Sequence, residues 1–186
     1  MTLDRILPFT KGLLEKVVVK GDCVIDATCG NGWDTVFLSH LVGKEGKVYA
    51  FDVQKEAIDR ASTRLKEARI KQVDLILDGH ENVLKYVDVE VSAAIFNLGY
   101  LPGSDKTITT HGATTWRAVV DILSLLAVGG IIVLVIYHGH EAGKAERAEI
   151  EAALVSLDPM KTEVLRYEFL NKNNAPYVIA IEKLRC

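Results

Sequence analysis

Residues 26–35 form a glycine-containing stretch, Asp26-Ala27-Thr28-Cys29-Gly30-Asn31-Gly32-Trp33-Asp34-Thr35. A short apolar segment, residues 23–25, precedes this stretch, and apolar residues at helical spacing follow it as far as Gly43. About twenty residues after Gly32, a second apolar segment ends in Asp52, which is the spacing of a nucleoside-cofactor fingerprint. A strand, a glycine loop that opens a helix, and a carboxylate at the end of the next strand predict a nucleoside-cofactor site.

Composition limits the classes of protein to which the chain can belong. With 186 residues, of which 49% are hydrophobic, we expect a single domain over residues 1–186. The formal net charge of −3 gives no global attraction to nucleic acid, although a local basic face would be enough to bind RNA. The three cysteines have no metal-ligand spacing, so we expect reduced thiols, no metal and a cytoplasmic protein. We also expect no signal peptide and no membrane-spanning segment.

Along the chain, apolar runs alternate with amphipathic segments. Residues 1–20 predict an N-terminal helical segment, one or two short helices that Pro8 interrupts. Strands are expected over 23–28, 47–52, 73–77, 91–96 and 131–137. Helices are expected after the glycine loop to Gly43, and over 54–69, 81–87, 112–127 and 142–157, with Gly129-Gly130 ending the fourth. Two further strands, 162–170 and 177–182, flank an asparagine-rich turn.

This alternation predicts an α/β fold, a doubly wound and mostly parallel sheet of seven strands with a C-terminal antiparallel hairpin and helices on both faces. Ligands of such sheets bind beyond the carboxyl ends of the strands. The polar residues expected there are Thr28–Gly32, Asp52, Asp78–His80, Asn97–Lys106 and His138–His140.

The acidic residue at the end of the first strand separates two cofactor classes. A dinucleotide fingerprint needs a third glycine, but Thr35 stands three residues after Gly32. Asp26 would repel a pyrophosphate, whereas it would attract a ligand that carries an ammonium and a sulfonium group. The pattern therefore favours S-adenosylmethionine over a nicotinamide dinucleotide.

These motifs resemble those of the class I S-adenosylmethionine-dependent methyltransferases, over almost the whole chain. The D-x-x-x-G-N-G form of residues 26–32 is similar to their first motif, with Thr28 in place of a glycine. Asp52 stands where the family binds the ribose, and residues 78–80 stand where it contacts the adenine. Residues 96–102 stand where members that methylate amines carry an N-P-P-Y-like segment. The resemblance implies a Rossmann-like methyltransferase fold.

More narrowly, residues 26–32 and 96–106 resemble the small bacterial YtqB-like family, labelled rRNA methylases and associated with tRNA wobble-uridine modification (MnmM). This resemblance implies N-methylation of the aminomethyl group of a wobble 5-aminomethyl-(2-thio)uridine. It also implies a tRNA partner contacted at the anticodon region. A homodimer would widen the RNA-binding face of so short a chain.

The residues expected to act fall into three groups. Asn97 would align the hydrogens of an acceptor amine, and Asp105 and His138 could take its proton. The expected cofactor-binding residues are Asp26, Thr28, Gly30, Asn31, Gly32, Asp34, Thr35, Asp52, Val53, Gln54, Asp78, Gly79, His80, Asn97 and Leu98. The expected RNA-binding residues are Tyr100, Lys106, His111 and Arg117.

Other functions fit parts of the pattern. The same cofactor site could serve an rRNA or a small-molecule methyltransferase. A non-catalytic protein with this fold could bind RNA, although the Asn97 loop argues against that. A nicotinamide oxidoreductase fits least well.

Overall fold

The computed structural model describes residues 2–99, 111–137 and 141–186. The strands are β1 (Cys23–Asp26), β2 (Lys47–Phe51), β3 (Val73–Ile76), β4 (Val91–Leu98), β5 (Leu126–Ile136), β6 (Thr162–Tyr167) and β7 (Tyr177–Lys183). The helices are α1 (Ile6–Val17), α2 (Trp33–Val42), α3 (Lys55–Glu67), the 3-10 helix η1 (His80–Lys85), α4 (Gly112–Leu125) and α5 (Glu141–Leu154).

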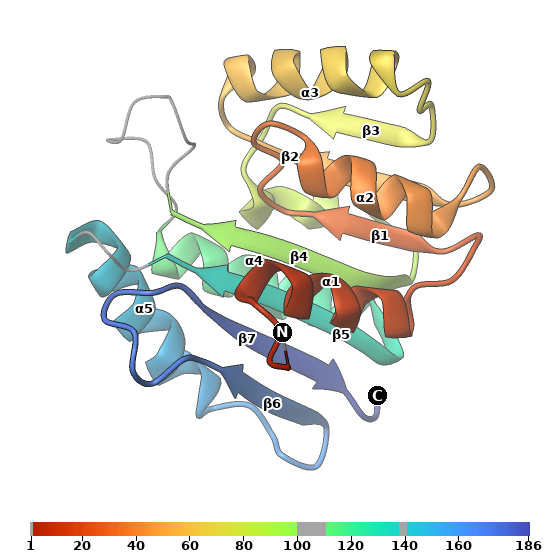
Figure 1. Cartoon of the computed structure of the whole chain (residues 1–186). Helices are drawn as coiled ribbons and strands as arrows, with labels where there is room; N and C mark the ends of the chain where they lie inside the picture. The colour runs from red at the N-terminus through yellow and green to blue at the C-terminus, as the bar shows by residue number, and fades with distance from the viewer. Residues whose placement is uncertain (1, 100–110, 138–140) are drawn as a thin grey trace.

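Among these residues, the seven strands form one sheet in the order β3-β2-β1-β4-β5-β7-β6 (Figure 1). Neighbours among β1 to β5 are parallel, whereas β7 is antiparallel to both β5 and β6. The prediction of a mostly parallel α/β sheet with a C-terminal antiparallel hairpin is confirmed. The carboxyl ends of β1, β2, β3, β4 and β5 meet at one edge, where ligands of such folds bind.

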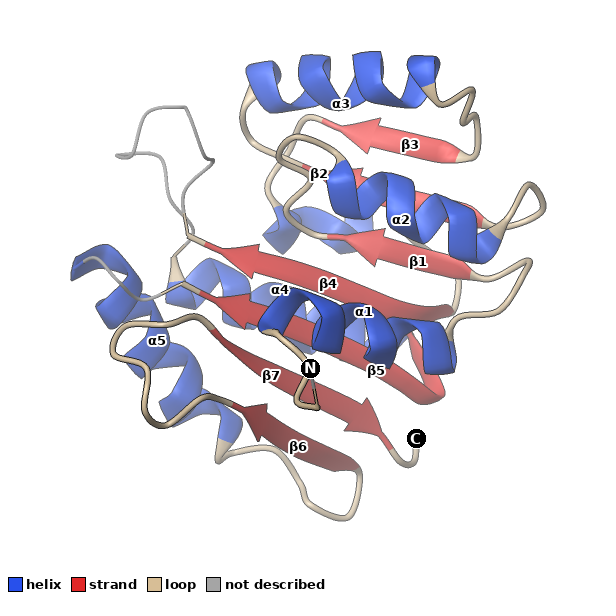
Figure 2. Ribbon diagram, in the orientation of Figure 1, coloured by secondary structure: helices blue, strands red, loops and turns tan. Residues whose placement is uncertain are grey.

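Helices cover both faces of the sheet because successive strand residues alternate between the faces. Val24 packs in a cluster with Leu14 of α1 and Leu38 of α2, whereas the next residue, Ile25, packs in the cluster that contains Ile122 of α4. Figure 2 shows α1 and α2 in front of the sheet and α4 and α5 behind it. Because helices cover both faces of the sheet, strand side chains on both faces are buried, and the central strands are apolar on both faces.

Two sequence expectations about helix boundaries are wrong. Helix α1 runs without a break through Pro8, which lies in its first turn, where a backbone N–H would have no partner within the helix. Helix α4 ends at Leu125, and Gly129-Gly130 lie inside β5. A register shift between β4 and β5 accommodates the extra residues there, and Gly129 has a φ of 81°.

The end of α4 is stabilised by a distant side chain instead of by a glycine. Lys183 of β7 donates hydrogen bonds from Nζ to the carbonyl oxygens of Leu123, at 3.0 Å, and Leu126, at 2.6 Å. A cationic group at a helix C-terminus also interacts favourably with the helix dipole. Because this partner comes from far along the chain, local sequence patterns give no indication of it.

The packing of α1 on the sheet predicts a difference between two leucines of this helix. Leu14 has no exposed surface, whereas Leu7 is 48% exposed. Leu14→Ala should lower the free energy of unfolding by about 2–5 kcal/mol, because it leaves a cavity between helix and sheet. Leu7→Ala should change it by less than about 0.5 kcal/mol. Urea unfolding of both variants measures the difference, and equal losses would contradict the docking of α1.

Candidate functional site

The loop between β1 and α2 is held at the carboxyl edge of the sheet by its own backbone. The Ala27 N–H donates to the carbonyl of Ile95, and the Cys29 N–H donates to the carbonyl of Phe51 at 2.8 Å. Gly30 and Gly32 have φ values of 52° and 77°, which L side chains rarely adopt. The loop is therefore fixed to the strands on both sides of β1, with a left-handed turn that the glycines permit.

Gly32 is also required by a close approach to α3. A Cβ atom on Gly32 would lie 3.0 Å from both Cα and Cβ of Ala61. Asn31 continues this contact, since its backbone carbonyl accepts from Arg64 Nε at 2.7 Å and its side-chain oxygen accepts from Arg60 at 3.2 Å. The side chain of Asn31 thus contacts α3, and its predicted role in cofactor binding stays a prediction.

Asp52, at the end of β2, ties the second strand to the glycine loop. One carboxylate oxygen accepts from the Gly30 N–H at 2.8 Å, and the other accepts from the Gln54 N–H at 2.9 Å. Each carboxylate oxygen has a further lone pair that could accept a ribose hydroxyl. Burial raises the pKa of Asp52, while the two backbone hydrogen bonds act in the opposite direction. The side chain of Val53, by contrast, is 61% exposed.

Asp26 is fully buried beneath the loop. Its carboxylate accepts from the hydroxyl of Thr35 at 2.6 Å and from the N–H of Thr28 at 3.3 Å. Burial, and after it the negative charge of Asp34, raises the pKa of Asp26 to about 7. A buried carboxylate that costs free energy to ionise is well placed to be stabilised by a cationic ligand.

Asn97 joins the acceptor side of the site to the glycine loop. Its backbone N–H donates to the hydroxyl of Thr28 at 2.7 Å, and its side-chain amide donates to Asp34 at 2.8 Å. Thr28 therefore supplies a hydroxyl that a glycine at this position could not. Tyr137, whose N–H donates to the carbonyl of Leu98, is near enough to Asp34 for that charge, after burial, to raise its pKa.

His80 carries a buried polar atom that a ligand could satisfy. Its Nδ1 lies 3.0 Å from the carbonyl oxygen of Ala27, which fixes Nδ1 as the donor. Its Nε2 is buried and has no hydrogen-bond partner among the described residues. Burial lowers the pKa of His80, so Nε2 is a neutral acceptor. Nε2 of His80 could accept a hydrogen bond from the exocyclic amine of an adenine. Together with the Asp52 carboxylate, which could accept ribose hydroxyls, it fits an adenosine-containing cofactor.

Asp78 has a different environment from the one predicted. Its carboxylate accepts hydrogen bonds from the Gly79 N–H, Asn82 and Tyr86, at 2.8 to 2.9 Å. The hydrogen bond from the Tyr86 hydroxyl is the main reason why the pKa of Asp78 is lowered. Asp78 thus organises the turn that positions His80, and a contact with adenine stays a prediction.

Several predicted residues cannot be placed in the site. Tyr100, Asp105, Lys106 and His138 lie outside the described residues. His111 is exposed and directly precedes α4, and Arg117 on α4 lies 3.8 Å from Asp121. Their roles in proton transfer and RNA binding therefore stay predictions.

Two contacts between distant segments are not indicated by the local sequence pattern. These are the hydroxyl of Thr28 with Asn97, and the amide of Asn97 with Asp34. The second could have been inferred, because Asp34 follows β1 and Asn97 belongs to the adjacent strand β4, whose carboxyl ends meet.

Comparisons with known proteins agree with this geometry. The family model described as "Putative rRNA methylase" matches residues 48–182. The chain belongs to this family. It is 38% identical over 180 residues to a chloroplastic tRNA (mnm(5)s(2)U34)-methyltransferase of Arabidopsis thaliana, a match that covers 91% of this chain and 66% of that protein.

Two solved structures of similar size share the fold of this methylase-family chain. A protein described as a putative rRNA-methylase from Clostridium thermocellum is 42% identical with a TM-score of 0.97, covering 98% of this chain and 100% of the other. A protein from Streptococcus mutans described as a putative methyltransferase, in complex with SAH, is 42% identical with a TM-score of 0.91 and the same coverage.

None of the helices described is both long enough and apolar enough to span a bilayer. Within the described residues, no group of three or more His, Cys, Asp or Glu side chains could hold a metal ion.

The raised pKa of Asp26 predicts a pH-dependent effect of Asp26→Asn. Between about pH 4 and pH 7, the folded protein holds a proton that the unfolded chain has released, so the contribution of Asp26 to stability falls as pH rises. Asp26→Asn removes this dependence. The variant should gain about 1–3 kcal/mol relative to the wild type at pH 8 compared with pH 5.

Urea unfolding of both proteins at the two pH values measures this difference. Titratable groups remote from Asp26 behave alike in both proteins and cancel in the comparison. A difference in stability that is the same at pH 5 and pH 8 would contradict the raised pKa.

Proposed function

We propose that this protein is an S-adenosylmethionine-dependent methyltransferase that N-methylates the aminomethyl group of wobble 5-aminomethyl-(2-thio)uridine in tRNA. One observation carries the proposal. The hydroxyl of Thr28, inside the glycine loop, accepts a hydrogen bond from the backbone N–H of Asn97 at 2.7 Å. Asn97, the residue expected to align the acceptor amine, therefore lies directly beside the loop expected to bind the cofactor. The product named by the Arabidopsis relative and the SAH of the Streptococcus mutans structure support the same assignment.

The cofactor would supply an activated methyl group, and residues of this chain would position it. Asp52 would accept the ribose hydroxyls, and Nε2 of His80 would accept from the adenine amine. Ionised Asp26 would favour the cationic methionine end from beneath the loop. These roles account for two carboxyl groups whose burial otherwise costs stability.

Recognition of RNA would come from the residues that follow Asn97 and from the start of α4. Tyr100 would stack on a base, and Lys106, His111 and Arg117 would contact phosphates in the anticodon region. The chain would act as a single domain in a homodimer and in the cytoplasm. The family description favours rRNA as a second candidate substrate.

Cofactor binding tests the first part of the proposal. Asp52→Ala should weaken the binding of S-adenosylmethionine about 10- to 100-fold, because it removes a charged hydrogen-bond acceptor and loosens the loop at Gly30. Asp74→Ala is the matched control, since Asp74 lies exposed on β3 and pairs with Lys47. Isothermal titration calorimetry measures both. Unchanged affinity in Asp52→Ala would refute the cofactor site.

The acceptor is tested by supplying RNA fractions to the purified enzyme. With S-adenosylmethionine, tRNA from cells that lack this methylation should gain methylaminomethyl-uridine, measured by mass spectrometry of nucleosides. Methyl groups that enter rRNA instead would favour the second candidate. Transfer to neither RNA would refute an RNA methyltransferase.

A further inference from the structure

Asp34 occupies a position that the cofactor site does not explain. It lies in the first turn of α2, where the helix dipole stabilises a negative charge. Its side chain does not serve as the N-cap, because that position is Gly32. Among the side chains that the structure describes, no Lys, Arg or His forms an ion pair with it. Its hydrogen-bond partner in this part of the chain is the amide of Asn97.

The contact with Asp34 determines how Asn97 faces an acceptor. The amide nitrogen of Asn97 donates to an Asp34 oxygen at 2.8 Å, while the backbone N–H is held by Thr28. The amide nitrogen carries a second N–H, and Oδ1 of Asn97 can accept a hydrogen bond from an acceptor group. The remaining lone pairs of the Asp34 carboxylate lie beside this amide, because the two side chains are hydrogen-bonded to each other.

The charge of Asp34 also reaches neighbouring groups of the site. It contributes to the raised pKa values of Asp26 on β1 and of Tyr137 at the end of β5. Side chains of α2, β1 and β4, and that of Tyr137 directly after β5, therefore lie within reach of this negative charge. The described residues supply no cation that forms an ion pair with Asp34. A ligand that brings a positive charge would be attracted to this position.

We infer that Asp34 and Asn97 together form the binding site for the acceptor amine, with Asp34 as the group that holds the ammonium ion and takes its proton. This inference rests on the proposed function, and it moves Asp34 from the cofactor to the acceptor. A primary amine has two N–H bonds once it is neutral. One would donate to Oδ1 of Asn97 and one to Asp34, which leaves the nitrogen lone pair directed toward the methyl donor.

The step balances in atoms and charge. One proton leaves the ammonium nitrogen for the Asp34 carboxylate, which becomes a carboxylic acid. The nitrogen lone pair then forms a bond to the methyl carbon, and the electrons of the broken sulfur–carbon bond stay on sulfur. The product is a methylated ammonium ion and S-adenosylhomocysteine, and Asp34 then releases its proton to water.

A carboxylate at this position predicts that an amine is preferred to a neutral acceptor. A hydroxyl or a ring nitrogen carries no charge, so it gains less than a cation does from the ionised carboxylate of Asp34. An alkyl ammonium gains both a charge-assisted hydrogen bond and a way to lose its proton. We therefore expect an alkyl amine to be favoured over an unmodified base at this site.

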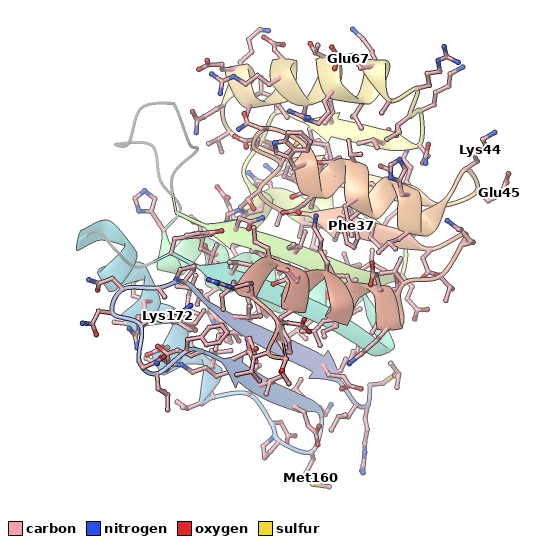
Figure 3. All side chains as sticks on the ribbon, in the orientation of Figure 1. Phe37, Lys44, Glu45, Glu67, Met160 and Lys172 are labelled. Atoms are coloured by element: carbon pink, nitrogen blue, oxygen red, sulfur yellow. The ribbon has the colours of Figure 1, made fainter. Side chains whose placement is uncertain are left out.

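Binding without reaction gives the first test. Two anticodon stem-loop RNAs that differ only in an aminomethyl group on the target uridine are titrated with enzyme and S-adenosylhomocysteine by fluorescence anisotropy. The wild type should bind the amine-bearing RNA about tenfold more tightly, and Asp34→Asn should abolish this preference. Glu45→Gln is the matched control and should keep it, because Figure 3 labels Glu45 in the turn after α2, at the far end of that helix from Asp34.

Two further measurements separate the acceptor from the cofactor. Asp34→Asn should bind S-adenosylmethionine within about threefold of the wild type, which also shows that the variant is folded. Its kcat at saturating RNA and cofactor should fall at least about 100-fold, because a general base has been removed.

Three outcomes would overturn the inference, and they are distinguishable. If the wild type neither prefers nor methylates the amine-bearing RNA, the proposed function fails and this inference fails with it. If the wild type does both and Asp34→Asn keeps both, only the role of Asp34 is refuted. If Asp34→Asn loses cofactor affinity and saturating cofactor restores kcat, Asp34 belongs to the cofactor site.

Discussion

The hydrogen bond between Thr28 and Asn97 is the contact on which the rest of the site depends. It joins the loop after β1 to the end of β4, the adjacent strand, through a side-chain hydroxyl and a backbone N–H at 2.7 Å. The bond from Gly30 to Asp52 makes the corresponding connection to the end of β2 on the other side. Because both neighbours of β1 hold the same loop, the position of a bound cofactor and that of an acceptor cannot vary independently.

Negative charge is concentrated at this edge at a cost in stability. Asp26 is fully buried and Asp52 is half-buried, and burial raises the pKa of both. Among the residues that the structure describes, no Lys, Arg or His forms an ion pair with Asp26 or Asp52. Such an arrangement is expected where binding a ligand offsets the cost of the buried charge, since perturbed carboxyl groups are common at functional sites. The two proposed ligands, S-adenosylmethionine and an alkyl ammonium group, both carry positive charge and would be attracted to these carboxylates.

Much of the fold could be predicted because local patterns are strong where strands are buried on both faces. The spacing of the sequence correctly predicts β1, the glycine loop after it, and the position of Asp52 at the end of β2. The end of α4 was not, because a glycine pair is equally compatible with a helix end and with a bulge inside a strand. The side chain that caps α4, Lys183, comes from β7, far along the chain. Pro8 was misjudged for a similar reason, since its effect depends on its position within the helix.

The site was only partly predictable, because a residue type does not reveal its partners. Thr28 was recognised as a replacement for a glycine, but its hydroxyl contact with Asn97 required the three-dimensional structure. Asp34 is among the residues expected to bind the cofactor, and the local sequence pattern gives no indication of its contact with Asn97. Asp78 stands at an expected ligand position, yet its carboxylate is occupied by Gly79, Asn82 and Tyr86.

Site-specific methyl transfer in vitro is the decisive test of an amine acceptor on the wobble uridine. Purified enzyme and S-adenosylmethionine with a labelled methyl group are incubated with an anticodon stem-loop whose wobble uridine carries an aminomethyl group, and with the same RNA carrying unmodified uridine. We expect label on the exocyclic amine of the first RNA alone, located by mass spectrometry of the digested nucleosides. Equal labelling of both RNAs, or label on a base or ribose atom, would contradict it.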